Sequence, residues 1–245
     1  MIELLIGIDD TDNKDTRGTG FRSRQMAEIF INEGYDVLDV IRHQLYVHKD
    51  IPYTSHNSSA CLHIFADNVQ KVIKLSRDFL NEIAADGSDV GLCVATIDKV
   101  NHEIEEWGKN AKKIILTQKD ARELAAKNNI FLEGLTGTHG GIIGALAAIG
   151  LRKWGSDGRC IWLKGKEIRD IKGVLQIKEL KKIVKLDEIQ TLSGKAVNDQ
   201  DFINVNEWFR PIIRNDKIIT FVESNKNKKN EWEIVSKDYI KSVSN

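Results

Sequence analysis

The first twenty residues constrain the fold of this chain more than any other stretch. Residues 1–8 form an apolar run rich in β-forming side chains, so they predict a buried strand. An acidic turn with the sequence DDTD follows at residues 9–12, and a loop with two glycines then leads into a helix predicted over residues 21–32. A strand, an acidic turn, a glycine loop and a helix in this order favour an α/β fold with a ligand site where the strand ends.

The acidic turn has the chemistry of a metal-nucleotide site. Asp9, Asp10 and Asp12 would repel one another, and oxygen ligands of this kind suit a hard cation such as Mg²⁺, so they are predicted as metal ligands and catalytic residues. The start of the next helix favours a phosphate, because its N–H groups and the positive end of its dipole point there. The alternative is a polar turn whose aspartates only cap the helix. The nucleotide-binding residues predicted in this region are Thr11, Arg17, Gly18, Thr19 and Gly20.

A second glycine-rich loop opens another predicted helix at residues 135–150. Gly137, Gly140 and Gly141 would let backbone N–H groups approach an anion, so they are also predicted to bind the nucleotide. His139 lies among them and is predicted as a catalytic proton-transfer group, with a contact to a phosphate or a loop carbonyl as the alternative. For His56, in a polar loop, the non-catalytic interpretation is preferred. The loop lacks the Gly-Lys-Ser/Thr ending of a Walker A motif, and a tight helix-packing turn is the competing explanation.

Composition narrows the class of protein. The chain has 245 residues and 41% hydrophobic content, enough for one large domain or two smaller ones. Lys plus Arg and Asp plus Glu both number 36, so no overall charge favours a nucleic-acid partner, although a local basic patch remains open. Three widely spaced cysteines argue against a zinc ribbon and a disulfide framework, and a reducing cytoplasm fits best. No leader or membrane-length apolar run is present, so no membrane partner is expected.

The pattern of elements predicts two domains. Residues 1–152 alternate between strand-like and helix-like segments and predict a mixed α/β domain. Residues 153–245 contain short β-like runs separated by glycines and polar turns, so they predict a smaller β-rich domain.

Three segments resemble a known family in the same order along the chain. Residues 6–12, 51–53 and 143–150 read IGIDDTD, IPY and IGALAAIG. Together they resemble the N-terminal kinase domain of archaeal tRNA(Ile) agmatidine synthetase, over residues 1 to about 152. The resemblance implies an enzyme that uses ATP and Mg²⁺ to phosphorylate the C2 carbonyl oxygen of an anticodon cytidine, which agmatine then displaces. It also implies that the three aspartates hold Mg²⁺ with ATP, and that the loops at residues 17–20 and 137–141 face phosphates.

The chain also departs from that family. Phe21 stands where the family has an autophosphorylated threonine, and the OB-fold and zinc ribbon that grip tRNA have no counterpart. We therefore expect a Mg-ATP-dependent phosphoryl-transfer enzyme whose acceptor is a nucleobase or a small molecule, with tRNA possible but not favoured. A small-molecule kinase or ligase unrelated to tRNA and a non-catalytic nucleotide-binding regulator are the alternatives. A homodimer is possible.

Overall fold

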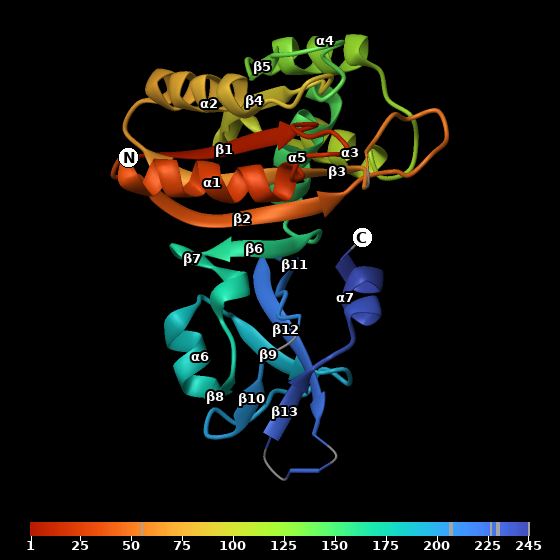
Figure 1. Ribbon diagram of the computed structural model, residues 1–245. Helices are drawn as coiled ribbons and strands as arrows, with labels where there is room; N and C mark the ends of the chain where they lie inside the picture. Colours follow the sequence, from red (N-terminus) through yellow and green to blue (C-terminus); the bar gives the residue numbers. More distant parts are fainter. Residues whose placement is uncertain (55, 206–207, 226, 229–230, 245) are drawn as a thin grey trace.

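A single mixed β-sheet runs through the molecule (Figure 1). The computed structural model describes residues 1–54, 56–205, 208–225, 227–228 and 231–244. In these ranges the sheet has thirteen strands, eleven of them in the order β5-β4-β1-β3-β2-β6-β11-β12-β13-β10-β8, while β7 pairs with β6 and β9 with β12. The predicted α/β fold class is confirmed.

The strands and helices have the following bounds. The strands are β1 (Ile2–Asp9), β2 (Asp36–Gln44), β3 (Ser58–Ala66), β4 (Gly91–Thr96), β5 (Phe131–Gly134), β6 (Arg159–Leu163), β7 (Lys166–Glu167), β8 (Val174–Gln176), β9 (Glu188–Thr191), β10 (Phe202–Asn204), β11 (Ile212–Arg214), β12 (Lys217–Ser224) and β13 (Glu231–Ile234). The α-helices are α1 (Thr19–Asn32), α2 (Val69–Ile83), α3 (His102–Asn110), α4 (Gln118–Lys127), α5 (Ile142–Trp154), α6 (Ile177–Ile183) and α7 (Lys237–Ser244). Two short 3-10 helices span Ile97–Lys99 and Ile168–Asp170.

The strand β1 lies between β3 and β4 and is buried on both faces. Because successive side chains of a strand point to opposite faces, Leu4, Ile6 and Ile8 join one core with residues of α1 and α2. Leu5 points the other way, into a second core built largely from α3 and α5. Helices thus cover both faces, which explains why residues 1–8 are almost continuously apolar.

The helix α5 rests directly on β1. A Cβ atom added to Gly7 would lie 2.0 Å from the carbonyl oxygen of Ala145, so only a glycine permits this approach. At the other end of the contact, a Cβ on Gly144 would lie 1.8 Å from an oxygen of Asp9. The small residues of α5 therefore bring its first turn against the end of β1.

The second half of the chain continues the same sheet. β6 pairs with β2, aligning Arg42 with Arg159, and β11 pairs with β6 at Arg159 and Ile212. Figure 1 shows the later strands extending below this junction, with α7 beside β11. Because α5 ends at Trp154 and the sheet is continuous, the division at residues 152 and 153 stays a prediction.

Two further expectations concern disulfide bonds and membrane-spanning helices. All three cysteines, Cys61, Cys93 and Cys160, are buried and free, so the structure contains no disulfide between them. Among the helices of the described ranges, none has both the length and the apolar character needed to cross a membrane.

Candidate active site

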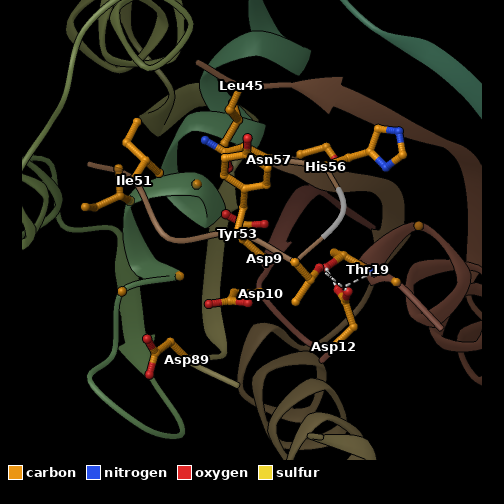
Figure 2. A pocket seen from close by; sticks show the side chains of 18 of the residues that line it. Asp9, Asp10, Asp12, Thr19, Leu45, Ile51, Tyr53, His56, Asn57 and Asp89 are labelled. Carbon is orange, nitrogen blue, oxygen red and sulfur yellow. Dashed lines mark hydrogen bonds between the residues drawn. The ribbon is translucent and has the colours of Figure 1, made fainter. Parts of the chain in front are cut away.

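A cavity of about 530 Å³ opens where β1 ends (Figure 2). Segments within residues 9–24, 51–58, 111–118 and 138–144 form most of its wall. Arg42, Ile161 and Arg169 add side chains from β2, β6 and the 3-10 helix that follows β7. The cavity is therefore built at the junction of the two halves of the chain.

This cavity brings together most of the residues that the sequence singles out. The acidic turn and the second glycine loop are neighbours in space, as a shared site requires. The predicted residues that line the cavity are Asp9, Asp10, Asp12, Arg17, Gly18, Thr19, Gly20, Gly140 and Gly141. The predicted residues Thr11, Gly137 and His139 do not line it.

Asp12 ties the acidic turn to the start of α1. Its Oδ1 accepts hydrogen bonds from the backbone N–H of Thr19 at 3.2 Å and from the Thr19 hydroxyl at 3.4 Å. Its Oδ2 accepts a hydrogen bond from the Thr54 hydroxyl at 2.7 Å. Gly18, the N-cap residue, has no side chain to cap the helix, so Asp12 takes that role from a distance. The helix-capping alternative thus applies to Asp12.

Thr11 has a structural position rather than a place in the cavity wall. It is fully buried, and its backbone N–H and hydroxyl lie 3.4 Å and 3.3 Å from the hydroxyl oxygen of Thr19. The predicted role of Thr11 in nucleotide binding is therefore not supported by its position, since its side chain holds the acidic turn against α1.

Asp9 and Asp10 are the acidic residues of the site whose pKa values are raised. Burial, followed by the charge of Asp10, raises the pKa of Asp9 to about 8. Burial, followed by the charges of Asp89 and Asp12, raises the pKa of Asp10 to about 6. Figure 2 shows Asp10 and Asp89 on the same side of the cavity. Carboxylates that are costly to ionise without a partner fit a site that receives a cation.

The donor set fits Mg²⁺ in a different way from the one predicted. Within the described ranges, no three His, Cys, Asp or Glu side chains are grouped so that they could hold a metal ion. The assignment of Asp9, Asp10 and Asp12 as metal ligands stays a prediction, and Asp12 also accepts hydrogen bonds from Thr19 and Thr54. Mg²⁺ is commonly held by only one or two carboxylates together with waters and substrate phosphates, and Asp9 and Asp10 suit that arrangement.

The glycines of the second loop serve two different purposes. A Cβ on Gly141 would lie 2.5 Å from the carbonyl oxygen of Asp89, and a Cβ on Gly137 would lie 1.9 Å from a carboxylate oxygen of Asp89. These two glycines are needed for packing, as the competing explanation of the motif holds. A Cβ on Gly140 would meet nothing closer than 3.6 Å, so Gly140 keeps open space beside the cavity.

His139 does not reach the cavity. Its backbone is left-handed, with a φ of 67°, and its side chain packs so closely on Gly134 that a Cβ there would lie 2.2 Å from the Cβ of His139. Its Nδ1 lies 3.5 Å from a guanidinium nitrogen of Arg122. The proposed proton-transfer role of His139 is thus not supported by its position, whereas His56 does line the cavity.

Several residues of the site escaped the sequence interpretation. Asp89 holds the second loop, because its Oδ2 accepts a hydrogen bond from the Thr138 hydroxyl at 2.8 Å. Its position two residues before the short strand β4 was the available signal. Arg42 and Arg169 gave no local signal, because they reach the cavity only through the pairing of β2 with β6 and the turn beyond it. Phe21 also lines the cavity and lies 4.3 Å beneath the Arg17 guanidinium.

Comparisons with known proteins agree with this arrangement at the level of fold. No family model matches the sequence. The uncharacterized protein MJ0921 of Methanocaldococcus jannaschii is 29% identical over 158 residues, which cover 62% of this chain and 50% of that protein. Three solved structures each align with 61% of this chain. They are apo TiaS (tRNAIle2 agmatidine synthetase) with a TM-score of 0.52 and 21% identity, the TiaS-tRNA(Ile2)-ATP complex with 0.54 and 21%, and a tRNA fluorescent labeling enzyme with 0.52 and 22%.

Over that part, this chain has the TiaS fold. The alignments cover 35% to 36% of the solved chains, so this chain matches about a third of their length and half of the curated relative. The resemblance seen in the three sequence segments is confirmed as a likeness of fold. Activity, substrates and partners do not follow from a likeness at this level of identity.

The raised pKa of Asp9 leads to a prediction about how stability depends on pH. The folded protein keeps the Asp9 proton up to a pKa of about 8, while the group ordinarily loses it near 3.8, so the folded state binds more protons between these values. The free energy of unfolding therefore decreases as pH rises through that window. Asp9→Asn should unfold with a free energy about 2 kcal/mol higher than wild type at pH 8 in metal-free buffer, with little difference near pH 4.

Urea denaturation at both pH values measures this difference. Asp15→Asn is the control, because Asp15 is an exposed residue of the neighbouring loop. An Asp9→Asn variant that is less stable than wild type at pH 8 would show that the carboxylate is well paired in the apo protein.

Proposed function

We propose that this chain is a Mg-ATP-dependent phosphoryl-transfer enzyme that activates a carbonyl oxygen for displacement by an amine. The observation that carries the proposal is a pair of carboxylates with raised pKa values, the buried Asp9 and the half-buried Asp10, in one cavity with Arg17 and Arg42. Acidic groups for a cation and guanidinium groups for phosphates are the two requirements of a metal-nucleotide site. The TiaS fold supports it, since one solved structure of that fold is named as a complex with ATP.

Each residue then has a defined task. Asp9 and Asp10 would hold Mg²⁺, which when bound neutralises the charge of the phosphates. Arg17, which lines the cavity near the start of α1, would orient the phosphates by charge-assisted hydrogen bonds. The first turn of α1 contributes less than the sequence predicted, because Asp12 already accepts from the Thr19 N–H. Gly140 leaves room for the phosphates beside the second loop.

The proposed reaction is the one that the resemblance to agmatidine synthetase implies. The γ-phosphoryl group of ATP passes to the carbonyl oxygen of the acceptor, so the bond to ADP breaks as a new P–O bond forms. The amine nitrogen then forms a bond to the activated carbon, and phosphate leaves with the former carbonyl oxygen. Phosphoryl transfer depends mainly on positioning and charge neutralisation, so the chain needs no strongly basic residue in the cavity for the first step.

One observation favours the regulator alternative. Phe21 stands at the family's threonine position, and its ring packs beneath Arg17 in the cavity wall. A binding protein that has lost turnover would have the same cavity and the same affinity for Mg-ATP. A possible homodimer, a cytoplasmic location and the absence of tight tRNA binding remain predictions from the sequence.

Nucleotide turnover separates the two candidates. The protein is incubated with γ-labelled ATP, agmatine and a panel of acceptors that includes cytidine, cytidine monophosphate and tRNA, in a titration of Mg²⁺. We expect ADP formation that depends on Mg²⁺ and on one acceptor, and that stops when EDTA is added. Saturable ATP binding without ADP formation from any acceptor would favour the regulator, and no ATP binding at all would contradict both.

A further inference from the structure

Two arginines face each other across the junction of the two halves of the chain. Arg42 of β2 and Arg159 of β6 are direct partners in an antiparallel pair. Side chains in that relation lie on the same face of the sheet, and like charges directly opposite each other are destabilising. Arg42 lines the cavity, so Arg159 lies on the cavity's face of the sheet, one strand further from the acidic turn.

A third arginine extends this charge along the second half of the chain. The guanidinium carbons of Arg159 and Arg210 lie 5.7 Å and 5.6 Å from the ring centre of Trp208. The ammonium of Lys237 lies 5.7 Å from the same ring. We call Arg42, Arg159 and Arg210 the arginine cluster.

The arginines of the cluster form no ion pair within the described part of the chain, although acids lie near it. The charge of Asp9 acts to raise the pKa of Arg42, and the charge of Glu167 acts to raise the pKa of Arg210. The charge of Asp157 acts to raise the pKa of Arg159. That carboxylate, however, already lies 2.8 Å from the Nδ1 atom of His43 and is paired with Lys112. Glu167 is paired with Arg24. Neither Arg42 nor Arg159 takes part in any ion pair between described residues.

The arginines of the cluster are also partly or fully buried, so keeping their side chains charged costs desolvation free energy. Arg159 is only 5% exposed, and Arg42 and Arg210 are half-buried. Burial, followed by the charges of Arg42 and Arg210, lowers the pKa of Arg159 to about 10. Burial, followed by the charge of Arg169, lowers the pKa of Arg210 to about 10 as well. Buried like charges without an ion pair of their own are expected where an anion completes the site.

We propose that the arginine cluster is a subsite for a phosphate group of the acceptor substrate. Planar guanidinium groups bind phosphate oxygens in pairs, so neighbouring arginines of this kind suit a phosphate group. The assignment to the acceptor rests on the proposed function, because the ATP phosphates are expected beside Asp9 and Asp10. Anion binding itself does not depend on that function. The phosphate belongs either to a small phosphate ester or to a short nucleic-acid strand.

Arg159→Gln tests the subsite, because a phosphate site and a packing role predict opposite effects. In low-salt buffer without phosphate, the variant should melt about 2–4 °C higher than wild type, since it removes a repelling charge. Inorganic phosphate at constant ionic strength should raise the melting temperature of wild type, and the dissociation constant for phosphate should be at least about tenfold higher in the variant.

A matched control is Arg214→Gln. The guanidinium of Arg214 also lies over an aromatic ring, 5.7 Å from the centre of Phe221, but Arg214 pairs with Lys217 in β12 and lies outside the cluster. Arg214→Gln should keep the phosphate response of wild type. An Arg159→Gln variant that melts lower than wild type and keeps the full phosphate response would overturn the proposal in favour of packing against Trp208.

Two further arms decide whose phosphate binds. If saturating Mg²⁺ and a non-hydrolysable ATP analogue leave the phosphate response intact, the subsite is separate from the ATP site, as proposed. Loss of the response would assign the cluster to ATP and overturn the acceptor assignment. If the analogue does not bind, the proposed function fails, while the phosphate response still tests the anion site. Competition by uridine monophosphate supports a small ester, and stronger competition by an RNA tetranucleotide supports a strand.

Discussion

Asp10→Asn should lower Mg²⁺-dependent ATP turnover by at least about 100-fold while the protein remains folded. The amide keeps the size of the side chain but removes the charge that holds the cation. Metal-ion stabilisation of a phosphoryl transition state is worth several kcal/mol, and each 1.36 kcal/mol corresponds to a factor of ten in rate. Steady-state turnover across a Mg²⁺ titration measures the loss.

The control for Asp10→Asn is Asp15→Asn, which changes a carboxylate in the exposed part of the same loop. Circular dichroism and a melting curve of both variants establish that the fold is retained. Asp10 has a left-handed backbone with a φ of 52°, a conformation that asparagine also tolerates. Turnover and Mg²⁺ dependence equal to wild type in Asp10→Asn would remove this residue from the metal site.

Gly141→Ala should destabilise the protein and Gly140→Ala should not, although the two glycines are adjacent. A Cβ on Gly141 would meet the backbone at 2.5 Å and 2.6 Å, at Asp89 and Gly91, so the loop must move away from β4. We expect Gly141→Ala to lower the unfolding free energy by about 3 kcal/mol or more, with a melting temperature lower by roughly 6–12 °C.

Gly140→Ala should unfold like wild type, because its Cβ has space, but a larger side chain there enters the cavity. Gly140→Val is expected to weaken ATP binding about tenfold with little loss of stability. Thermal melts and nucleotide titrations of the three variants provide the comparison. A stable Gly141→Ala variant, or an unstable Gly140→Ala variant, would contradict the packing of this loop against β4.

The local pattern of the sequence was sufficient to predict the acidic turn, the strand before it and the second glycine loop. A run of apolar, β-forming side chains is a local signal, and residues 1–8 show it with one charged residue, Glu3. The start of α1 was placed two residues too late, at residue 21 instead of Thr19. The reason is that Asp12 caps the helix from seven residues away, which is not a capping pattern that a sequence displays.

The direction of single side chains was less predictable. The left-handed backbone of His139 turns its side chain toward Gly134 and away from the cavity. Arg42 and Arg159 become neighbours only because β2 pairs with β6, a contact between strands that are far apart in the chain. Composition gives only the net charge of the chain, so it could not predict where arginines gather.

Calorimetric titration with a non-hydrolysable ATP analogue tests most directly whether the cavity is a metal-nucleotide site. The titration is done for wild type and Asp10→Asn, each in Mg²⁺ and in EDTA. We predict one molecule bound per chain, at least about tenfold tighter in Mg²⁺ than in EDTA for wild type, and no such difference for Asp10→Asn. Absence of binding to wild type, or equal binding in all four titrations, would contradict a Mg-ATP site at the end of β1.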